Sequence, residues 1–327
     1  MKLAHVTGIA WLLLAGLVVT AGAEVGTLKQ IVPGVWFREG ETRPETRVVL
    51  CANSAVIEMK EYLIVVDANF PSCAQALIGE VKAISPKPIK YVIDTHHHRD
   101  HAYGNPVFTK MGAVTLAHAG VAEEMDRYEP ARWQHEAQER KDVAELNLPT
   151  PERPLLKYTR SPYVISDSTR KVMLYNFGWG HTRGDTFVYL PREKVLCTGD
   201  VVLNGPFITT SDANIANWPK VIRAAEKLDV KYVLPGHGPA GGKDLLEGQA
   251  QFLLELYKAV GAAIKQGKTL DQLVITEDGK QISTSIQLPA SVQYWVSLQP
   301  WKLPRQVQDT YEEITQGKPH GEIAGGK

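Results

Sequence analysis

Asp94-Thr95-His96-His97-His98-Arg99-Asp100-His101 is the segment of this 327-residue chain on which the interpretation of the remainder depends. It follows Lys90-Tyr91-Val92-Ile93, an apolar, β-branched and aromatic run that predicts a short buried strand. Imidazoles and carboxylates crowded at a strand end are costly to bury unless something binds them, because each loses its water. Neutral imidazole nitrogen and carboxylate oxygen suit zinc, so the segment predicts a metal site. The alternative is an exposed polar loop, or a His-rich tract that binds metal loosely.

Three later segments repeat this chemistry. They are Asn176–Asp185, a Gly-rich loop that contains His181; Lys194–Asp200, an apolar strand that ends on Asp200; and Lys231–Gly238, a strand followed by His237. Each has Gly or Pro close by, and glycine lets the backbone approach a site closely. Because potential metal ligands occur at four strand ends or loops in order, the exposed-loop alternative no longer fits.

The combined pattern resembles the signature of the metallo-β-lactamase superfamily, H-x-H-x-D-H followed by a lone His, a lone Asp and a final His. The matching residues are His96, His98, Asp100, His101, His181, Asp200 and His237. The resemblance extends from about residue 35 to about residue 242. It implies an α/β (α+β) fold, the four-layered αββα sandwich, with the metals at one edge between two β-rich halves.

The resemblance also implies a ligand set for two Zn²⁺ ions. The first would be bound by His96, His98 and His181, and the second by Asp100, His101 and His237, with Asp200 bridging both. His97 and Arg99 would point away from the metals. Asp94 and Asp185 would orient histidine ligands, as metal sites usually require, whereas Asn53 and Asp67 would brace the core.

Composition and charge limit the class of protein. The chain is 44% hydrophobic and 22% charged, and its formal net charge is zero. These values indicate a globular protein and give no support for a nucleic-acid surface. We expect one domain at residues 24–318, with C-terminal helices from about 242 to 318 packed on it, and a disordered tail at residues 319–327. The sequence does not indicate an oligomeric state.

Residues 1–23 have the pattern of a secretion signal: Lys2, an apolar run, and Ala21-Gly22-Ala23 as a cleavage site after Ala23. We therefore expect a periplasmic or extracellular protein without membrane association after cleavage; an uncleaved anchor is the alternative. In an oxidising compartment Cys51 and Cys73 could form a disulfide, which the odd cysteine count leaves open. Cys197 lies in an apolar strand and is interpreted as a buried residue.

Hydrophobic periodicity predicts further elements. Strands are expected at residues 34–38, 46–50, 55–58, 62–67 and 113–117, and helices at 72–84, 218–228, 244–266 and near 304–315. His118 is interpreted as a cap at a helix or strand end. The charged segment 121–148 is expected to be helical, as part of a lid or as a surface helix. Residues 150–162 are expected to form a connecting loop, and residues 203–218 a long loop beside the metals.

The expected reaction follows from the implied site. Two metal ions can lower the pKa of a bridging water to about 7 and polarise a carbonyl group. We therefore expect the metal-bound hydroxide to cleave a lactam, lactone, ester or thioester in a small-molecule substrate, with Asp100 able to shuttle a proton. One alternative is a β-lactamase proper, although established β-lactamases of this family mostly have Cys or Ser where Asp200 stands. Others are an iron-dependent dioxygenase-type member and a non-catalytic metal-binding member.

Overall fold

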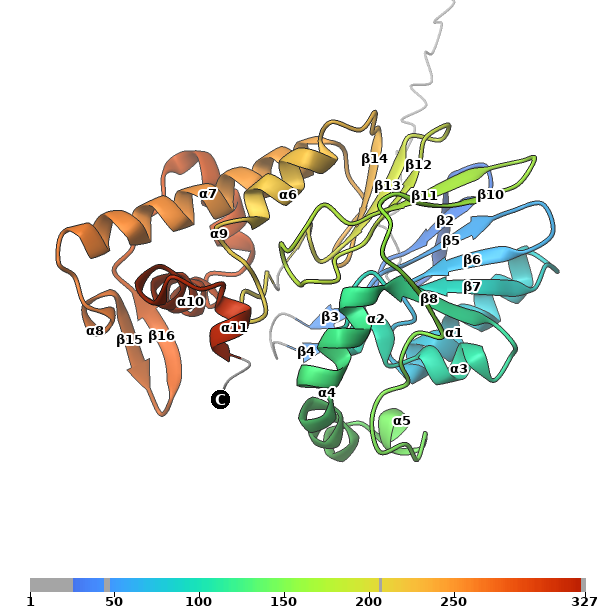
Figure 1. Cartoon of the computed structure of the whole chain (residues 1–327), viewed down its shortest axis with the longest axis horizontal. Coiled ribbons are helices and arrows are strands. Elements are labelled where there is room, and N and C mark those ends of the chain that lie inside the picture. The colour runs from blue at the N-terminus through green and yellow to red at the C-terminus, as the bar shows by residue number, and fades with distance from the viewer. Residues whose placement is uncertain (1–25, 44–47, 206–207, 325–327) are drawn as a thin grey trace, which may run out of the picture.

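The structure is a computed structural model that describes residues 26–43, 48–205 and 208–324. The predicted signal at residues 1–23 and part of the predicted strand at 46–50 lie outside the described residues. Two mixed β-sheets occupy the centre of the fold (Figure 1).

The larger sheet has seven strands in the order β1-β2-β5-β6-β7-β8-β9. Their bounds are Leu28–Val32, Val35–Arg38, Ser54–Glu58, Leu63–Val66, Ile89–Ile93, Val114–His118 and Leu156–Tyr158. The smaller sheet has five strands in the order β10-β11-β12-β13-β14. Their bounds are Tyr163–Ser166, Lys171–Tyr175, Phe187–Leu190, Val195–Gly199 and Tyr232–Pro235. The strands that precede the predicted metal ligands, β7, β13 and β14, each have a parallel neighbour.

Alternation along the strands explains how both faces of the larger sheet are buried, since successive side chains point to opposite faces. In β6, Ile64 and Val66 join the core between the sheets, whereas Leu63 and Val65 pack beneath helices. Leu174, Val188 and Leu234 supply the smaller sheet's side of this shared core. A sheet buried on both faces accounts for the nearly continuous apolar runs of its strands.

Helices cover the two outer faces. The larger sheet is covered by α1 (Pro71–Ile84) and α3 (Asn105–Thr109). The smaller sheet packs against α6 (Trp218–Ala225) and α7 (Asp244–Lys265), whose apolar side chains share a cluster with β12, β13 and β14. The resulting order of layers is helix, sheet, sheet, helix (Figure 1). The predicted αββα sandwich is therefore confirmed.

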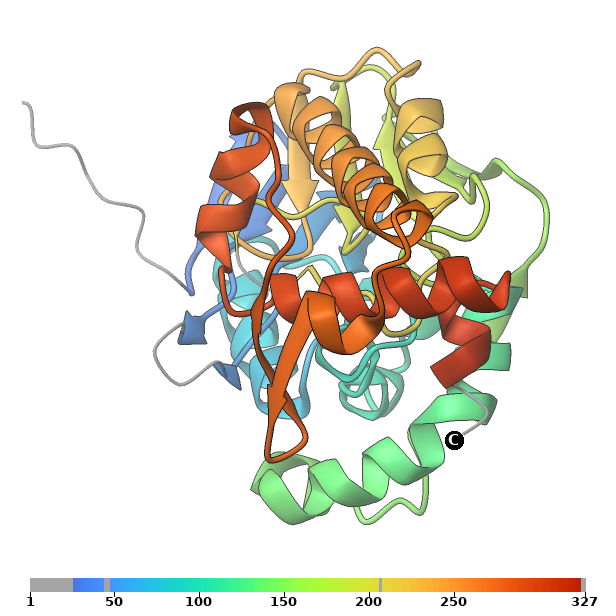
Figure 2. The ribbon, with the colours of Figure 1, turned by 90° about the vertical axis from the view of Figure 1, so that its left-hand side faces the viewer.

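Further elements extend from these layers. The remaining bounds are β3 (Thr42–Arg43), β4 (Val48–Val49), α2 (Arg99–Ala102), α4 (Ala119–Glu139), α5 (Lys141–Ala144), α8 (Leu270–Leu273), β15 (Val274–Glu277), β16 (Lys280–Thr284), the 3-10 helix η1 (Ala290–Val292), α9 (Gln293–Leu298), α10 (Leu303–Gln316) and α11 (His320–Ala324). Figure 2 shows α10 crossing the molecule, with the β15–β16 hairpin extending from it toward α4. Val307 of α10 belongs to the same apolar cluster as α7 and the smaller sheet.

Two local expectations were wrong. Residues 150–162 contain the short edge strand β9, which pairs with β8, rather than a loop alone. Residues 320–324 form α11 instead of a disordered tail, while residues 325–327 lie outside the described residues. The reason is long-range: buried His320 places its ring Nδ1 2.8 Å from the carbonyl oxygen of Ser211. A short polar segment gives no local sign of such a partner.

Two cysteine questions are also answered. Cys51 and Cys73 form a disulfide, and Cys197 is free and buried. Within the described part of the chain, no helix combines the length and apolarity needed to cross a bilayer.

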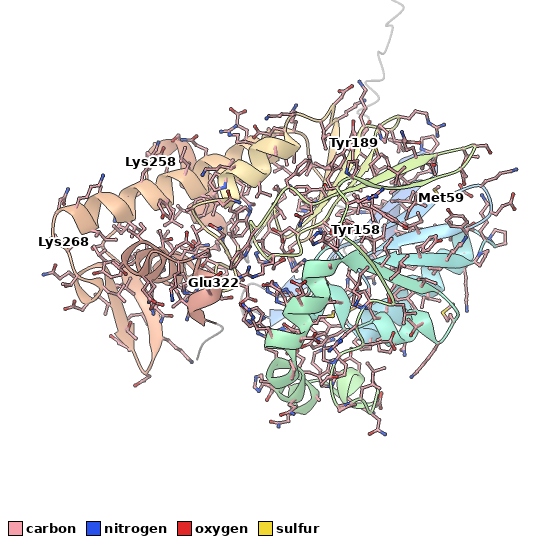
Figure 3. All side chains as sticks on the ribbon, in the orientation of Figure 1. Met59, Tyr158, Tyr189, Lys258, Lys268 and Glu322 are labelled. Atoms are coloured by element: carbon pink, nitrogen blue, oxygen red, sulfur yellow. A yellow bond between two sulfur atoms is a disulfide. The ribbon has the colours of Figure 1, made fainter. Side chains whose placement is uncertain are left out.

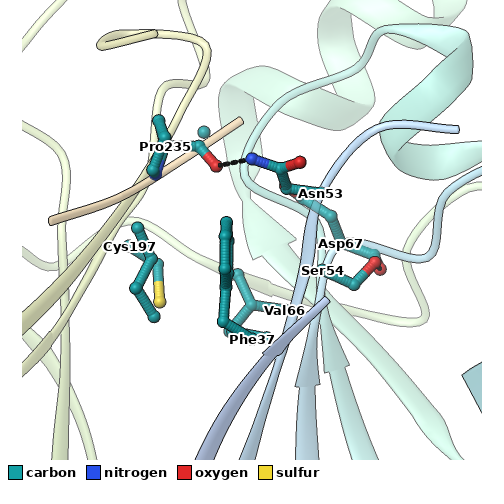
Figure 4. A pocket seen from close by; sticks show the side chains of 10 residues that line it. Phe37, Asn53, Ser54, Val66, Asp67, Cys197 and Pro235 are labelled. Carbon is teal, nitrogen blue, oxygen red and sulfur yellow. Dashed lines mark hydrogen bonds between the residues drawn. The ribbon is translucent and has the colours of Figure 1, made fainter. Parts of the chain in front are cut away.

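Asn53 ties the two sheets together next to the ends of β5 and β14 (Figure 4). Its Nδ2 donates to the carbonyl oxygens of Pro235 and Gly238, both at 2.8 Å. Its Oδ1 accepts from the backbone N–H of Gly40 at 2.7 Å. Because Asn53 is only 3% exposed, water cannot replace these bonds. The structure thus agrees with the bracing role expected for this residue.

We predict that Asn53→Ala lowers the free energy of unfolding by about 2–4 kcal/mol, because two buried carbonyls and one N–H lose their partner. Urea denaturation measures the change. Gln75→Ala, at an exposed position of α1, is the control and should stay within about 0.5 kcal/mol of the parent protein. An equally small change for Asn53→Ala would contradict the bracing role.

Candidate metal centre

The seven predicted ligands meet at one edge of the two sheets. His96, His98, Asp100 and His101 follow β7, His181 precedes β12, Asp200 follows β13 and His237 follows β14. Ligand atoms of His96, His98, His181 and Asp200 lie within 4.8 Å of one another, and so do those of Asp100, His101 and His237. Parallel strands end at the same edge of a sheet, which explains why residues far apart in sequence meet here.

Asp200 lies between the two groups. Its Oδ1 is 3.2 Å from Nε2 of His101, and its Oδ2 is 3.5 Å from Nε2 of His237 and 3.9 Å from Nε2 of His181. One carboxylate thus faces histidines of both groups. This is the position that a bridging ligand requires.

The first group is a set of buried imidazoles held neutral. Burial lowers the pKa of His96 well below its usual value, lowers that of His98, and lowers that of His181 to about 3. Nε2 of His96 is buried and has no hydrogen-bond partner among the described residues. A neutral nitrogen lone pair without a partner is what a divalent cation binds. The donor set therefore fits a metal ion.

The second group is a cluster of opposite charges. Burial disfavours a charged His101, but Asp200, Asp67 and Asp100 raise its pKa well above the usual range. Burial likewise opposes charge on His237, yet Asp200 and Asp100 raise its pKa to about 9. The pKa of Asp200 is well below its usual range, because His237 and His101 outweigh burial. Two carboxylates with two imidazoles have the composition for a second divalent cation.

Two glycines let the backbone approach this cluster. A Cβ at Gly236 would lie 2.0 Å from Oδ1 of Asp200, and one at Gly199 would lie 2.4 Å from Oγ1 of Thr95. Gly199 also has a φ of +49°, a region that other residues adopt at a cost. Any larger side chain at either position would displace the carboxylate of Asp200 or the loop that precedes His96.

The rings of His98, His101 and His181 are each oriented by a bond at one nitrogen. Nδ1 of His101 lies 2.9 Å from Oδ2 of Asp67, and Nδ1 of His181 lies 3.1 Å from the carbonyl oxygen of Thr209. Nε2 of His98 lies 2.8 Å from Oδ2 of Asp212, which leaves its Nδ1 facing His181. Such partners fix the tautomer and direction of a ligand.

Some orienting roles differ from the sequence-based expectation. Asp94 was expected to orient a histidine, but within the described residues its bond is with Nδ2 of Asn105, at 2.8 Å. Asp67, interpreted only as a core brace, performs that task for His101 from the neighbouring strand β6. Asp185 holds the ligand loop through the backbone, since its Oδ2 accepts from the N–H of His181 at 2.8 Å.

His118 caps α4, as expected, by accepting from Gly120 N–H.

Asp212 belongs to the site but was not selected by the sequence analysis. It is buried behind the first group and receives a bidentate bond from Arg132, with Nη1–Oδ2 of 2.7 Å and Nη2–Oδ1 of 2.8 Å. His97 points away from the ligand atoms, as expected, and places its Nε2 3.2 Å from Oδ2 of Asp212. Arg132 also binds Glu129 of the same helix at 3.0 Å. Helix α4 thereby fixes the carboxylate that orients His98.

The loop that contains Thr209 and Asp212 is held from its other side by the C-terminal helices. Glu313 of α10 accepts from the N–H groups of Ile215 at 2.9 Å and Ala216 at 2.7 Å. Gln306 donates to the carbonyl of Ile208 at 2.8 Å. Asp309 accepts from the hydroxyl of Thr210 at 2.6 Å. The long loop therefore borders the metal site, as predicted, and is fixed there by residues near the chain end.

A cavity of about 970 Å³ opens over the ligands, a volume suited to a small molecule. His98, Asp100, Asp200 and His237 line its floor. Residues of α4, among them His135 and Glu136, form one wall, so this helix does face the site. Trp133 of the same helix does not face the cavity. Its side chain is buried against Tyr103, and its Nε1 donates to the carbonyl of Leu148.

Comparisons with known proteins agree with this geometry. A family model described as the metallo-beta-lactamase superfamily matches residues 49–237. Metallo-beta-lactamase type 2 of Bacteroides fragilis is 32% identical over 114 residues, which cover 33% of this chain and 44% of that protein, less than half its length. Acyl-coenzyme A thioesterase MBLAC2 of Gallus gallus is 25% identical over 218 residues, covering 62% of this chain and 71% of that protein.

The fold has counterparts among solved structures. The metallo-beta-lactamase FIM-1 from Pseudomonas aeruginosa, solved in a mono-zinc form, superimposes with a TM-score of 0.55 at 24% identity. The match covers 70% of this chain and 94% of that one. This likeness supports the αββα architecture.

We predict that Asp212→Ala weakens binding of one metal ion by about 10–100-fold, because His98 loses the acceptor that orients its ring. Competition with a chromogenic chelator measures the affinity. Asp229→Ala is the matched control, since this aspartate pairs with Lys194 at the surface and should leave the affinity unchanged. Unaltered affinity in Asp212→Ala would contradict the orienting role.

A second prediction concerns the C-terminal helices. Glu313→Ala should raise the hydrogen-exchange rates of amides in residues 208–217 and weaken metal binding about tenfold, because three N–H groups lose their acceptor. Hydrogen-exchange mass spectrometry measures these rates in the segment 208–217. Glu277→Ala, exposed on β15, serves as control. Unchanged exchange in Glu313→Ala would show that the loop keeps its conformation without α10.

Proposed function

The chain belongs to the metallo-β-lactamase superfamily and is a hydrolase of that superfamily, and we propose that it is a binuclear zinc enzyme that cleaves a lactam, lactone, ester or thioester bond. The observation that carries the proposal is the convergence of three imidazoles and a shared carboxylate at the floor of a cavity, beside a second His and Asp group. A site of that composition, open to a small molecule, suits hydrolysis at a polarised carbonyl.

In this proposal each of the two ligand groups would bind one zinc ion. His96, His98 and His181 would hold the first ion, and Asp100, His101 and His237 would hold the second, with the carboxylate of Asp200 facing histidines of both groups. Bound zinc supplies two things, a lowered pKa for water and polarisation of a carbonyl oxygen. Neutral imidazoles in the first group favour zinc because no proton has to leave them.

The chain's own residues supply orientation and proton handling. Asp100 lines the cavity, and its Oδ2 lies 3.2 Å from Nε2 of His237. A carboxylate at the edge of both the ligand group and the cavity is placed to pass a proton to a leaving group. Asp67, Asp212 and the carbonyl of Thr209 keep the rings in place meanwhile.

Two substrate classes receive specific support. Relatives named as an acyl-coenzyme A thioesterase and as metallo-β-lactamases favour acyl substrates with a good leaving group. An aspartate at the position of Asp200 is typical of the thioesterases and lactonases of the superfamily, and it therefore favours a thioester or a lactone as the substrate. The 32% identical relative favours β-lactam cleavage as the second candidate. We place the protein in the periplasm or outside the cell, because disulfides such as Cys51–Cys73 persist in oxidising compartments.

We predict about two zinc ions per chain and hydrolysis of one class among a chromogenic cephalosporin, a lactone and a thioester. His96→Ala and Asp200→Ala should each lower the metal content and reduce turnover by at least about a thousandfold, since each removes a ligand of the reacting centre. Elemental analysis and steady-state kinetics measure these quantities. His118→Asn is the matched control, because asparagine also caps a helix.

Two outcomes would contradict the proposal. Full turnover after both ions have been lost would exclude the metal-assisted reaction. One iron per chain, with no hydrolysis of any of the three substrates, would favour the iron-dependent dioxygenase alternative.

A further inference from the structure

Thr95 lies between the end of β7 and the first candidate ligand, His96, and it is buried, with 1% of its surface exposed. Its hydroxyl contacts two groups of the site. Oγ1 lies 3.0 Å from Oδ2 of Asp67 and 3.1 Å from Nδ1 of His96. The hydroxyl therefore stands between a carboxylate and the ring of a candidate ligand. The direction of these two bonds decides which nitrogen of that ring carries a proton.

The direction of the first bond follows from the surroundings of Asp67. Its Oδ1 accepts from the backbone N–H of Thr95 at 2.8 Å. Its Oδ2 receives the hydroxyl of Thr95 and lies 2.9 Å from Nδ1 of His101. A carboxylate with donors on both oxygens only accepts hydrogen bonds, and a hydroxyl has a single proton to donate. Thr95 therefore donates that proton to Asp67.

The direction of the second bond is then fixed as well. The hydroxyl offers only a lone pair to His96, so Nδ1 of His96 is the donor. Burial lowers the pKa of His96 well below its usual value, so the ring is neutral and carries one ring proton. That proton is on Nδ1, and Nε2 keeps its lone pair. Nε2 is also the nitrogen that has no hydrogen-bond partner among the described residues.

Contacts from both sheets hold Thr95 in place. A Cβ at Gly199, the last residue of β13, would lie 2.4 Å from Oγ1 of Thr95, so this strand packs closely against the hydroxyl. The carbonyl of Thr95 accepts from the N–H of Thr186 at 2.8 Å. The hydroxyl of Thr186 lies in turn 2.8 Å from that of Tyr158 in β9, which is labelled in Figure 3. These neighbours limit how far the hydroxyl of Thr95 can turn away from His96.

We propose that Thr95 is a positioning residue of the candidate metal centre: its hydroxyl keeps the proton of His96 on Nδ1 and so presents Nε2 to the first metal ion. This inference rests on the proposed function, because it concerns the same zinc site. His101 is bonded to Asp67 directly rather than through Thr95, so the hydroxyl serves the first ion and not the second. Residues that orient a ligand in this way contribute about 10–100-fold to metal affinity.

The test compares Thr95→Val with Thr95→Ser. Valine keeps the shape of threonine and lacks the hydroxyl, whereas serine keeps the hydroxyl and lacks the methyl group. Titration with Co²⁺ in competition with a chelator measures the affinity of each ion, and the absorption bands of Co²⁺ report which ligand set is filled. Thr95→Val should weaken the ion bound by His96 by about 10–100-fold and leave the other unchanged. Thr95→Ser should retain most of the affinity.

A role in packing alone predicts the opposite order, because valine fills the space of threonine better than serine does. Nitrogen-15 NMR of the histidine rings in the zinc-loaded protein gives a second readout. The Nδ1 proton of His96 should exchange slowly with water in the parent protein and in Thr95→Ser, because it is buried and has an acceptor. In Thr95→Val the same proton should exchange faster.

Thr115→Val is the matched control. Thr115 is a buried threonine of β8, the strand that pairs with β7, and its hydroxyl accepts from the N–H of Leu155 at 3.0 Å. Its replacement makes the same chemical change in the same sheet, away from the ligands. Both ion affinities should therefore be unaltered.

The outcomes separate this inference from the hydrolase proposal. Unchanged affinity for both ions in Thr95→Val would overturn the positioning role and leave the hydrolase proposal intact. A larger loss in Thr95→Ser than in Thr95→Val would do the same, because packing would then explain the effect. The predicted order of the variants, without hydrolysis of any carbonyl substrate, would sustain the role of Thr95 and contradict the hydrolase. A parent protein that binds neither ion would overturn both.

Discussion

The structure depends on keeping a group of imidazoles and carboxylates buried at the edge of two sheets. His96, His101, His181 and His237 are at most 2% exposed, and their neighbours Asp67 and Asp212 are 3% and 1% exposed. Burial of this many polar groups is tolerated only when each has a partner. The protein meets this requirement with opposite charges in one half of the site. In the other half, a nitrogen of His96 is left for a cation.

The partners come from every part of the chain. Asp67 comes from the end of β6, Asp212 from the loop after β13, and Arg132 from α4. The loop that carries Thr209 and Asp212 is fixed in turn by Glu313 of α10, close to the C-terminus. The geometry of a centre built near residue 100 is therefore set by contacts with residues beyond 300. The last helices thus act on the site as well as on the core.

This distribution explains what the sequence could and could not predict. The seven ligands were recognisable because each follows or precedes an apolar strand and together they match one family pattern. Hydrophobic periodicity predicted individual elements such as β5, β6, α1 and α7, whereas the order of the layers was expected from the family resemblance. Asp212 was not, because it lies in an irregular loop and acts only through Arg132 and His98, both distant in sequence. Asp94 was assigned the role of Asp67 because local sequence cannot tell which neighbouring strand end reaches a ring. Helix α11 forms for a similar reason, through a bond between His320 and Ser211.

The division between floor and walls also bears on how such a site acquires specificity. Its floor is made of the candidate metal ligands, so a substitution there would alter the proposed chemistry itself. Its walls, α4 on one side and the β15–β16 hairpin with α10 on the other, carry charged residues outside that ligand set. Lys302 occupies the boundary, since Thr209 links it to His181 through one residue. A substitution at Thr209 is therefore expected to alter the wall and the orientation of His181 together, because both contacts involve this residue.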